Sequence, residues 1–287
     1  LRPTGFDWPR ISAIREALAF GFHLVVTRLA WFSYSNADSV VAGKLLGTIP
    51  LGFYGLARDF ASMPVSKISI LLIRVTPAYF SAVQNQPAQL RRYLLSMTEG
   101  LAMLTFPAAV GLALVAADFV PIIIGEKWSG AVDPLRLMAI YASFRSVTPL
   151  LAQILAAVGD TRFAMRNSVL AAIVLPFGFI IGSHWGVVGI AASWIIMHPA
   201  VLIPVYRRVF RAIDLTAGQY FRSLLPATVG CVWLTAVVLL VRFGVGDHLP
   251  VGARFTLETA AGALAYTTVM MTRYRARMQS VLAVARS

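Results

Sequence analysis

Two basic side chains in the middle of an apolar stretch are the first candidates for chemistry. Lys67 and Arg74 occur in the run Leu51–Gln84, which is long enough to cross a bilayer. Ionisable groups inside a membrane segment are costly, so they usually mark a functional site. Their spacing is about two helical turns, which places both on one helix face together with Asp59. We expect this face to line a cavity that could take a phosphate-bearing ligand.

Structural explanations compete with this one. Arg74 lies about two turns from the predicted cytoplasmic end of its helix, so its long side chain could reach the interface. Lys67 lies nearer the middle of the membrane, where that reach is harder. Either cation could pair with Asp59 or Glu99. Glu99 could also carry a proton, or it could neutralise Arg74, Arg145 or Lys67, and structural pairing is the more common outcome.

A second polar face lies in the first apolar segment. It carries Arg28, Trp31 and Tyr34, with Asp38 near its outer end. Arginine forks onto phosphate and aromatic faces stack on sugar rings, so this face could bind a sugar phosphate. Alternatively, the two aromatic residues form an interfacial belt. Asp38 could likewise form only a helix-end ion pair with Lys44.

A third polar face lies in the fourth apolar segment. Tyr141, Arg145 and Thr148 share this face, and Gln153 follows one or two turns later. Arg145 is deep in the segment and therefore needs a partner or water. We expect Arg145 to face the same cavity as the cations of the second segment.

The elements that must position these residues follow from composition. The chain has 287 residues, of which 58% are hydrophobic and only 13% are charged, whereas soluble domains have about 25% charged residues. Repeated apolar runs of about 20 residues indicate an all-α, polytopic membrane protein. About eight spans are predicted, at Ile14–Leu46, Tyr54–Ala82, Tyr93–Ile124, Pro134–Val158, Met165–Gly182, Val187–Tyr206, Leu224–Phe243 and Arg254–Thr272. We expect Phe106 and Pro107 to interrupt the third of them.

The net charge of +13 comes from 25 basic and 12 acidic residues. In a soluble protein this excess would suggest nucleic acid, but here it concentrates in alternate loops. The opposite loops carry only Lys44, Lys127, Arg242 and Arg254. By the positive-inside rule, both termini are expected to face the cytoplasm. No nucleic-acid partner is expected.

We divide the chain into five parts. They are a lead-in (1–13), a six-helix core (14–210), an interfacial amphipathic segment (211–222), two peripheral transmembrane helices (223–274) and a basic cytoplasmic tail (275–287). Because Leu1 is not Met, we expect the chain to be the later part of a longer one.

Soluble-enzyme chemistry finds little support in the sequence. The single Cys231 allows no intrachain disulfide and argues against a structural zinc site. Nucleotide-binding and hydrolase motifs are absent, so no cofactor or metal is expected. We therefore expect a protein that is not an enzyme.

Four passages together resemble the polysaccharide-transport branch of the MOP superfamily of multidrug, oligosaccharidyl-lipid and polysaccharide exporters. They are NADSVVAGKLLG running into LGFYGLA (36–57), PVSKISILLIRVTPAYF (64–80), FVPIIIGEKWSGAVDPL (119–135) and FRSVTP (144–149). The resemblance covers residues 20–211 well, and the last two helices match only in hydropathy.

The resemblance implies a two-lobed bundle with alternating access, in which this chain is the C-terminal lobe and a missing N-terminal lobe is its partner. It implies a flippase for oligosaccharide repeat units linked to undecaprenyl pyrophosphate. Lys67, Arg74 and Arg145 occupy the positions of its cavity cations, and Arg28 would join them. Candidate sugar contacts are Trp31, Tyr34 and Gln153. Asp38, Asp59 and Glu99 are candidates for an ion or a pairing role.

Two rival functions remain open. A cation-coupled multidrug exporter of the same superfamily would need deep acidic groups, whereas the deep charges here are mainly basic. A membrane-embedded glycan polymerase or acyltransferase would want a large outer loop or a catalytic His/Asp set, and the predicted outer loops are short. Both are less favoured than a flippase that meets its lipid-linked oligosaccharide among the membrane lipids.

Overall fold

All regular structure in the described part of the chain is helical, as the sequence predicts. The computed structural model describes residues 11–73, 80, 83, 86–245, 249–275 and 277. The helices are α1 (Ile11–Val41), α2 (Thr48–Ile73), α4 (Pro87–Phe119), α5 (Val132–Ala157), α6 (Thr161–Gly182), α7 (Gly186–Ala212), α8 (Ala217–Val245) and α9 (Val251–Arg273). Single π-helical turns extend α1 to Leu46 and α4 to Ile124.

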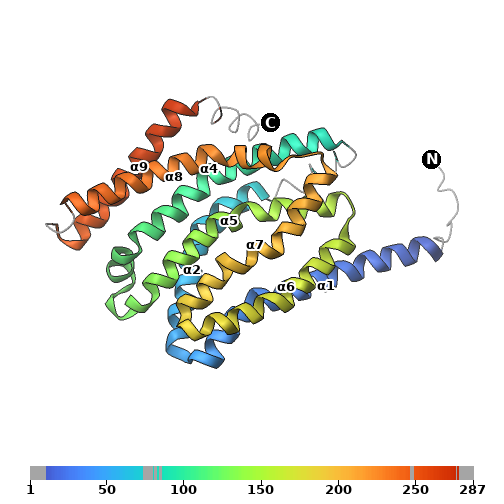
Figure 1. The fold of residues 1–287 in the computed structure, drawn as a ribbon, viewed down its shortest axis with the longest axis horizontal. Coiled ribbons are helices and arrows are strands. Elements are labelled where there is room, and N and C mark those ends of the chain that lie inside the picture. Colours follow the sequence, from blue (N-terminus) through green and yellow to red (C-terminus); the bar gives the residue numbers. More distant parts are fainter. Residues whose placement is uncertain are drawn as a thin grey trace, which may run out of the picture.

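The helices run side by side along the long axis of the molecule (Figure 1). The turns that follow α1, α4 and α6 lie at one end, and the turns that follow α5 and α7 lie at the other. Each of these helices corresponds to one predicted span. Three segments of the described chain are long and apolar enough to cross a membrane by length and composition, namely Pro87–Ile124, Thr161–Ala212 and Ala217–Gly244. The number of spans therefore stays a prediction.

The connection between α7 and α8 is shorter than expected. The stretch predicted as a separate interfacial segment divides between the end of α7 and the start of α8. The reason is a capping box at the start of α8. The backbone N–H of Gln219 donates to the Thr216 hydroxyl at 3.3 Å, and the Gln219 side chain accepts from the Thr216 N–H at 3.2 Å.

The expected interruption at Phe106 and Pro107 is wrong, because α4 continues through both residues. Pro107 cannot donate to the carbonyl of Met103, four residues earlier. The hydroxyl of Tyr266 on α9 donates to that carbonyl instead, at 2.6 Å. Pro149 in α5 is accommodated in a similar way, because the hydroxyl of Thr148 donates to the carbonyl of Arg145 at 2.9 Å.

Helices α8 and α9 lie at one edge of the bundle (Figure 1), and buried charges attach them to α4. Glu258 is fully buried and accepts two hydrogen bonds from Arg242, at 2.9 and 2.6 Å. Arg254 pairs with Asp118 of α4, which is itself only 2% exposed. These four side chains balance in charge, as buried ionic groups require.

The apolar core consists of two clusters, one toward each end of the bundle. The first cluster joins the end of α1 and the start of α2 to the start of α5 and α7, around Tyr54, Leu135 and Trp194. The second joins the first half of α4 to the second half of α5, around Leu94 and Ile154. Polar side chains gather between the two clusters, and they form the site described next.

Candidate functional site

A polar cavity of about 440 Å³ lies among α1, α5, α6 and α7, with Arg58 of α2 at its edge. This volume falls within the range of small-molecule sites, roughly 300–1,000 Å³. Its polar lining residues are Thr27, Tyr34, Ser35, Asp38, Arg58, Tyr141, Arg145, Thr148, Asn167, Ser168, Trp194 and His198. Five helices therefore contribute to one cavity.

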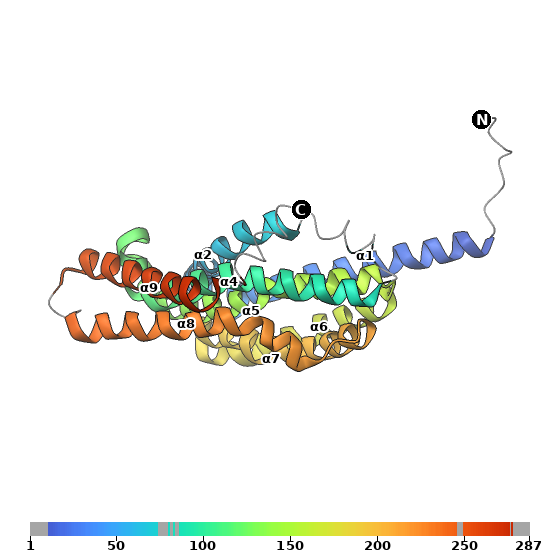
Figure 2. The same cartoon turned by 90° about the horizontal axis from the view of Figure 1, so that it is seen from above.

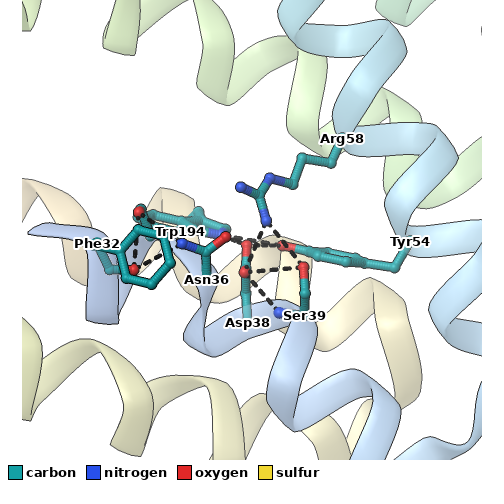
Figure 3. Close-up of polar contacts among 8 residues, drawn as sticks. Phe32, Asn36, Asp38, Ser39, Tyr54, Arg58 and Trp194 are labelled. Carbon is teal, nitrogen blue, oxygen red and sulfur yellow. Dashed lines mark hydrogen bonds and ion pairs between the residues drawn. The ribbon is translucent and has the colours of Figure 1, made fainter.

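Asp38 is the most deeply buried charge in this cavity, with no exposed surface. Its Oδ2 atom accepts hydrogen bonds from the Tyr54 hydroxyl at 2.7 Å and from the Trp194 indole N–H at 3.0 Å. Its Oδ1 atom accepts from the backbone N–H of Ser39 at 2.6 Å and from Arg58 at 3.1 Å. Figure 3 shows Arg58 and Tyr54 reaching Asp38 from one side and Trp194 from the other.

This network satisfies the carboxylate completely. A buried carboxylate is tolerated only when it is paired and hydrogen-bonded, because the low dielectric otherwise penalises its charge. Arg58 supplies the opposite charge, and three further donors occupy the remaining acceptor positions. Asp38 is therefore a structural joint between α1, α2 and α7, and its charge is already balanced within the protein.

Aromatic rings form the wall beside this joint. The rings of Tyr141 and Trp194 stack with their centroids 5.1 Å apart and their planes at 29°. The imidazole of His198 meets both rings edge-on, at 5.4 and 5.7 Å. Such a wall presents flat apolar faces beside polar edges, which is the combination that suits a sugar ring.

Arg145 is the cation without a balancing acid. Its guanidinium interacts electrostatically with Tyr34, Tyr141 and His198. No carboxylate of the described residues lies within ion-pair distance of it. It also lines a second, smaller cavity of about 170 Å³ between α2 and α5. Arg145 thus lies between two hollows and is exposed to both.

The structure brings four predicted site residues together in the larger cavity: Trp31, Tyr34, Asp38 and Arg145. Trp31 is 52% exposed at this cavity, and Tyr34 is half-buried. The predicted polar faces of the first and fourth segments therefore meet in this cavity. The second segment contributes mainly Arg58 to it.

The other predicted residues lie elsewhere. Arg28 is exposed beside the cavity residue Thr27, and Gln153 is half-buried outside the cavity lining. Lys67 and Asp59 are exposed on α2. The stretch of α2 after Pro64 stands out from the layer of the other helices (Figure 2), as a proline inside a helix favours. Arg74 lies outside the described residues.

Two predicted pairings are corrected. Asp38 pairs with Arg58, not with Lys44, because Arg58 on the next helix faces the buried carboxylate directly. Glu99 pairs at 3.1 Å with Arg277, which follows α9. Lys67 and Arg145 are not the partners of Glu99, because the chain after α9 brings Arg277 to the first half of α4.

Four residues of the site were missed by the sequence analysis: Tyr54, Arg58, Trp194 and His198. A signal for Arg58 was present. Asp38 and Arg58 lie at similar distances on either side of the turn at Gly47, so opposite charges face each other across a helical hairpin. Trp194 and His198 are four residues apart and share a face of the sixth span.

The chain is similar to known proteins of polysaccharide biosynthesis. A family model described as a polysaccharide biosynthesis protein matches residues 6–133. The teichuronic acid biosynthesis protein TuaB of Bacillus subtilis is 27% identical over 273 residues, which is 92% of this chain and 55% of that relative. The lipopolysaccharide biosynthesis protein WzxC of Escherichia coli is 23% identical over 237 residues, 82% of this chain and 48% of that relative.

These similarities support the resemblance to the polysaccharide-transport branch of the MOP superfamily. A further relative is a membrane protein in the cps region of Klebsiella pneumoniae, which is 30% identical over 192 residues, 66% of this chain and 40% of that protein. The chain spans about half the length of the curated relatives it matches. No solved structure matches it.

Proposed function

We propose that this chain is one lobe, the C-terminal one, of a flippase that moves lipid-linked oligosaccharide repeat units across the bacterial inner membrane. The substrate carries a pyrophosphate and several sugars, and its lipid tail stays among the membrane lipids. The polar cavity would alternate between the two sides of the membrane as this lobe moves against its partner lobe. Both chain termini would face the cytoplasm.

One observation carries this proposal: an unbalanced cation, Arg145, projects into a cavity walled by aromatic rings. A guanidinium that lacks an acid inside the protein is available to an anionic ligand. The neighbouring rings of Tyr141 and Trp194 offer faces for sugars. A ligand that combines negative charge with sugar rings therefore matches the cavity better than an apolar cation does.

The rival multidrug exporter is less well supported. Exchange of a cationic drug for an ion requires a deep carboxylate that is free to bind either. The deep carboxylates of the described residues are all paired with arginine, namely Asp38 with Arg58, Asp118 with Arg254, and Glu258 with Arg242. The cavity is therefore suited to a negative ligand.

The exposed cations Lys67 and Arg28 have a different role in this proposal from that of Arg145 in the cavity. Lys67 lies on the projecting part of α2 and Arg28 lies beside the cavity on α1, so both face outward from this lobe. They would neutralise the pyrophosphate at the surface that meets the partner lobe, and we propose that Arg74, which lies outside the described residues, acts with them. Trp31 and Tyr34 would contact the first sugars.

Flipping can be measured directly in proteoliposomes that contain the intact protein and a fluorescent lipid-linked oligosaccharide. We expect protein-dependent translocation, which the combined change Lys67→Gln and Arg74→Gln should slow by at least about tenfold, since each charge-assisted contact contributes about that factor. Arg162→Gln, at an exposed position at the start of α6, serves as the control. Translocation no faster than in protein-free liposomes would refute the flippase, and normal translocation by the double variant would refute the pyrophosphate site.

A further inference from the structure

Three buried polar atoms beside the second apolar cluster have no hydrogen-bond partner. Within the part of the chain that the structure describes, they are the hydroxyl oxygens of Thr98 and Tyr220 and the side-chain oxygen of Gln153. Thr98 has no exposed surface, and Tyr220 is only 1% exposed. Buried polar atoms nearly always bond to the protein or to an ordered water, because an unpaired one loses its hydration without compensation. The three atoms therefore call for a partner.

Thr98 and Gln153 lie at the same level of two neighbouring helices. α4 and α5 run in opposite directions, and the hydroxyl oxygens of Thr105 and Ser146 are 2.9 Å apart across their contact. Thr98 precedes Thr105 by seven residues, and Gln153 follows Ser146 by seven. Seven residues make about two helical turns, so each side chain points in nearly the same direction as its counterpart two turns away. Thr98 therefore faces Gln153 across the contact between α4 and α5.

Tyr220 brings its hydroxyl to the same place from α8, which packs along α4. This hydroxyl lies close to those of Thr98 and Tyr206, but neither contact has the geometry of a hydrogen bond. The ring of Tyr220 packs against those of Tyr206 and Phe210, with centroids 5.4 and 5.3 Å apart. These contacts fix the direction of the hydroxyl. The three unpaired atoms thus come from three helices and converge on one place.

The chemistry of these atoms selects a small, uncharged ligand. The side chains packed around them are apolar, among them Leu94, Leu101 and Ile154. A cation would enter without a counter-charge, which is costly in apolar surroundings, because the neighbouring Glu99 is already paired with Arg277. A water molecule can accept from one hydroxyl and donate to two other oxygens, and buried waters make about three such bonds.

We propose that one buried water molecule binds between α4, α5 and α8, where it accepts from the Tyr220 hydroxyl and donates to the oxygens of Thr98 and Gln153. None of these three residues lines the polar cavity, so this site is separate from the one already described. The water holds the first turn of α8 to the core. At the other end of the same helix, Arg242 contacts Asp118 of α4 at 3.7 Å. The peripheral helix is therefore attached by solvent at its start and by charge at its end.

X-ray footprinting tests this site on the intact protein in lipid nanodiscs. A brief X-ray pulse turns a bound water into a hydroxyl radical, which oxidises the side chain beside it, and mass spectrometry locates the product. We expect X-rays to oxidise Tyr220. Hydroxyl radicals made in the bulk solvent by photolysis of hydrogen peroxide should spare it, because its ring is buried. Oxidation in neither experiment would overturn the proposal, and so would oxidation in both, since the site would then open to solvent.

Variants locate the water. Thr98→Val and Gln153→Met each remove one partner and nearly keep the size of the side chain. We expect their combination to abolish most of the X-ray oxidation of Tyr220, since each lost hydrogen bond weakens water binding about fivefold. Thr105→Val is the matched control, because Thr105 is an equally buried threonine of α4 whose hydroxyl is bonded within the protein. Unchanged oxidation in the double variant, or an equal loss in the control, would overturn the proposal. The unfolding temperature of each variant checks that it is folded.

Unfolding in different salts separates a water from a cation. The unfolding temperature should be the same in sodium, potassium and choline chloride at equal ionic strength. A rise in one of these salts that disappears in Tyr220→Phe would show a bound cation and overturn the proposal. None of these measurements involves the lipid-linked substrate, so their outcome is independent of the test of the flippase.

Discussion

Asp38 shows how a single residue can organise a polar cavity inside an apolar bundle. Its carboxylate collects donors from three helices: Tyr54 and Arg58 of α2, Trp194 of α7, and the backbone of α1. The indole that it holds is also the indole that stacks on Tyr141. The buried carboxylate of Asp38 thus fixes the position of the Trp194 ring, which forms part of the aromatic wall of the cavity.

The first prediction concerns this charge pair. Arg58→Met should lower the free energy of unfolding by about 3–5 kcal/mol, because it leaves a buried carboxylate without its cation. Thermal or denaturant unfolding of the detergent-solubilised protein measures the effect. Adding Asp38→Asn to Arg58→Met should restore part of the lost stability, since the amide carries no charge to compensate.

Arg136→Gln is the control for this prediction. Its partner Asp133 is exposed, and exposed ion pairs contribute only about 0–1 kcal/mol. If Arg58→Met costs no more than Arg136→Gln, the Asp38–Arg58 pair does not have the structural role described here.

Sequence reasoning identified half of this site. Trp31, Tyr34, Asp38 and Arg145 were predicted because charge and aromatic side chains inside an apolar run are conspicuous. Trp194 was not, because a tryptophan in an apolar helix is normally buried core, and nothing along the chain reveals that it faces a carboxylate from a distant helix. Lys67 was predicted to lie on the face that lines the cavity, whereas its helix projects from the bundle after Pro64.

At the scale of elements, prolines within helices are matched by hydroxyl groups. The carbonyl freed by Pro107 receives the hydroxyl of Tyr266, and that freed by Pro149 receives the hydroxyl of Thr148. Tyr266 can reach α4 because Gly230 on α8 leaves room, since a Cβ atom at that position would clash with the tyrosine ring. The contact between α4 and α9 therefore depends on a glycine of a third helix.

The second prediction tests this contact. Tyr266→Phe should lower stability by about 1 kcal/mol, because the carbonyl of Met103 then has no donor. In a Pro107→Ala background the same change should cost less, since the alanine N–H can bond that carbonyl within the helix. The unfolding free energies of the four proteins form a double-mutant cycle. An equal cost in both backgrounds would show that the hydroxyl does not compensate for the proline.

Helix positions were well predicted from apolar runs, whereas helix junctions were not. The fourth and fifth spans, for example, were placed within a few residues of α5 and α6. The interruption at Pro107 was predicted from the intrinsic effect of proline, and a tertiary hydrogen bond overrides that effect. The capping box of Thr216 and Gln219 was readable along the chain, and it begins α8 within the stretch predicted as an interfacial amphipathic segment (211–222).

At the scale of the whole molecule, the turns alternate between two ends, as a multi-pass membrane protein requires. Figure 1 shows the turns that follow α4 and α6 at one end and the turn that follows α5 at the other. Lys127 and His184 belong to the first two turns, and Arg162 begins α6 directly after the third. The predicted orientation places Lys127 and His184 on the outer side of the membrane and Arg162 on the cytoplasmic side.

The third prediction tests this orientation by cysteine labelling. Cys231 is buried and is the one cysteine of this chain, so replacing it with alanine leaves the introduced cysteine as the one thiol of the chain. In intact spheroplasts, a membrane-impermeant maleimide should label Lys127→Cys and His184→Cys, and it should label Arg162→Cys only after lysis. All three side chains are exposed in the fold. Labelling of Arg162→Cys before lysis would invert the topology.

The packing of α1 has a consequence for how the protein is made. The ribosome produces α1 before α2, α4 and α5, yet α1 packs mainly on α6 and makes few contacts with α2. During synthesis α1 must therefore wait in the lipid for its neighbour. Arg58 follows Asp38 by only 20 residues, so these two charges can already neutralise each other when the α1–α2 hairpin leaves the insertion machinery. The ion pair that shapes the finished cavity thus also lowers the cost of placing Asp38 and Arg58 in the bilayer before α6 is made.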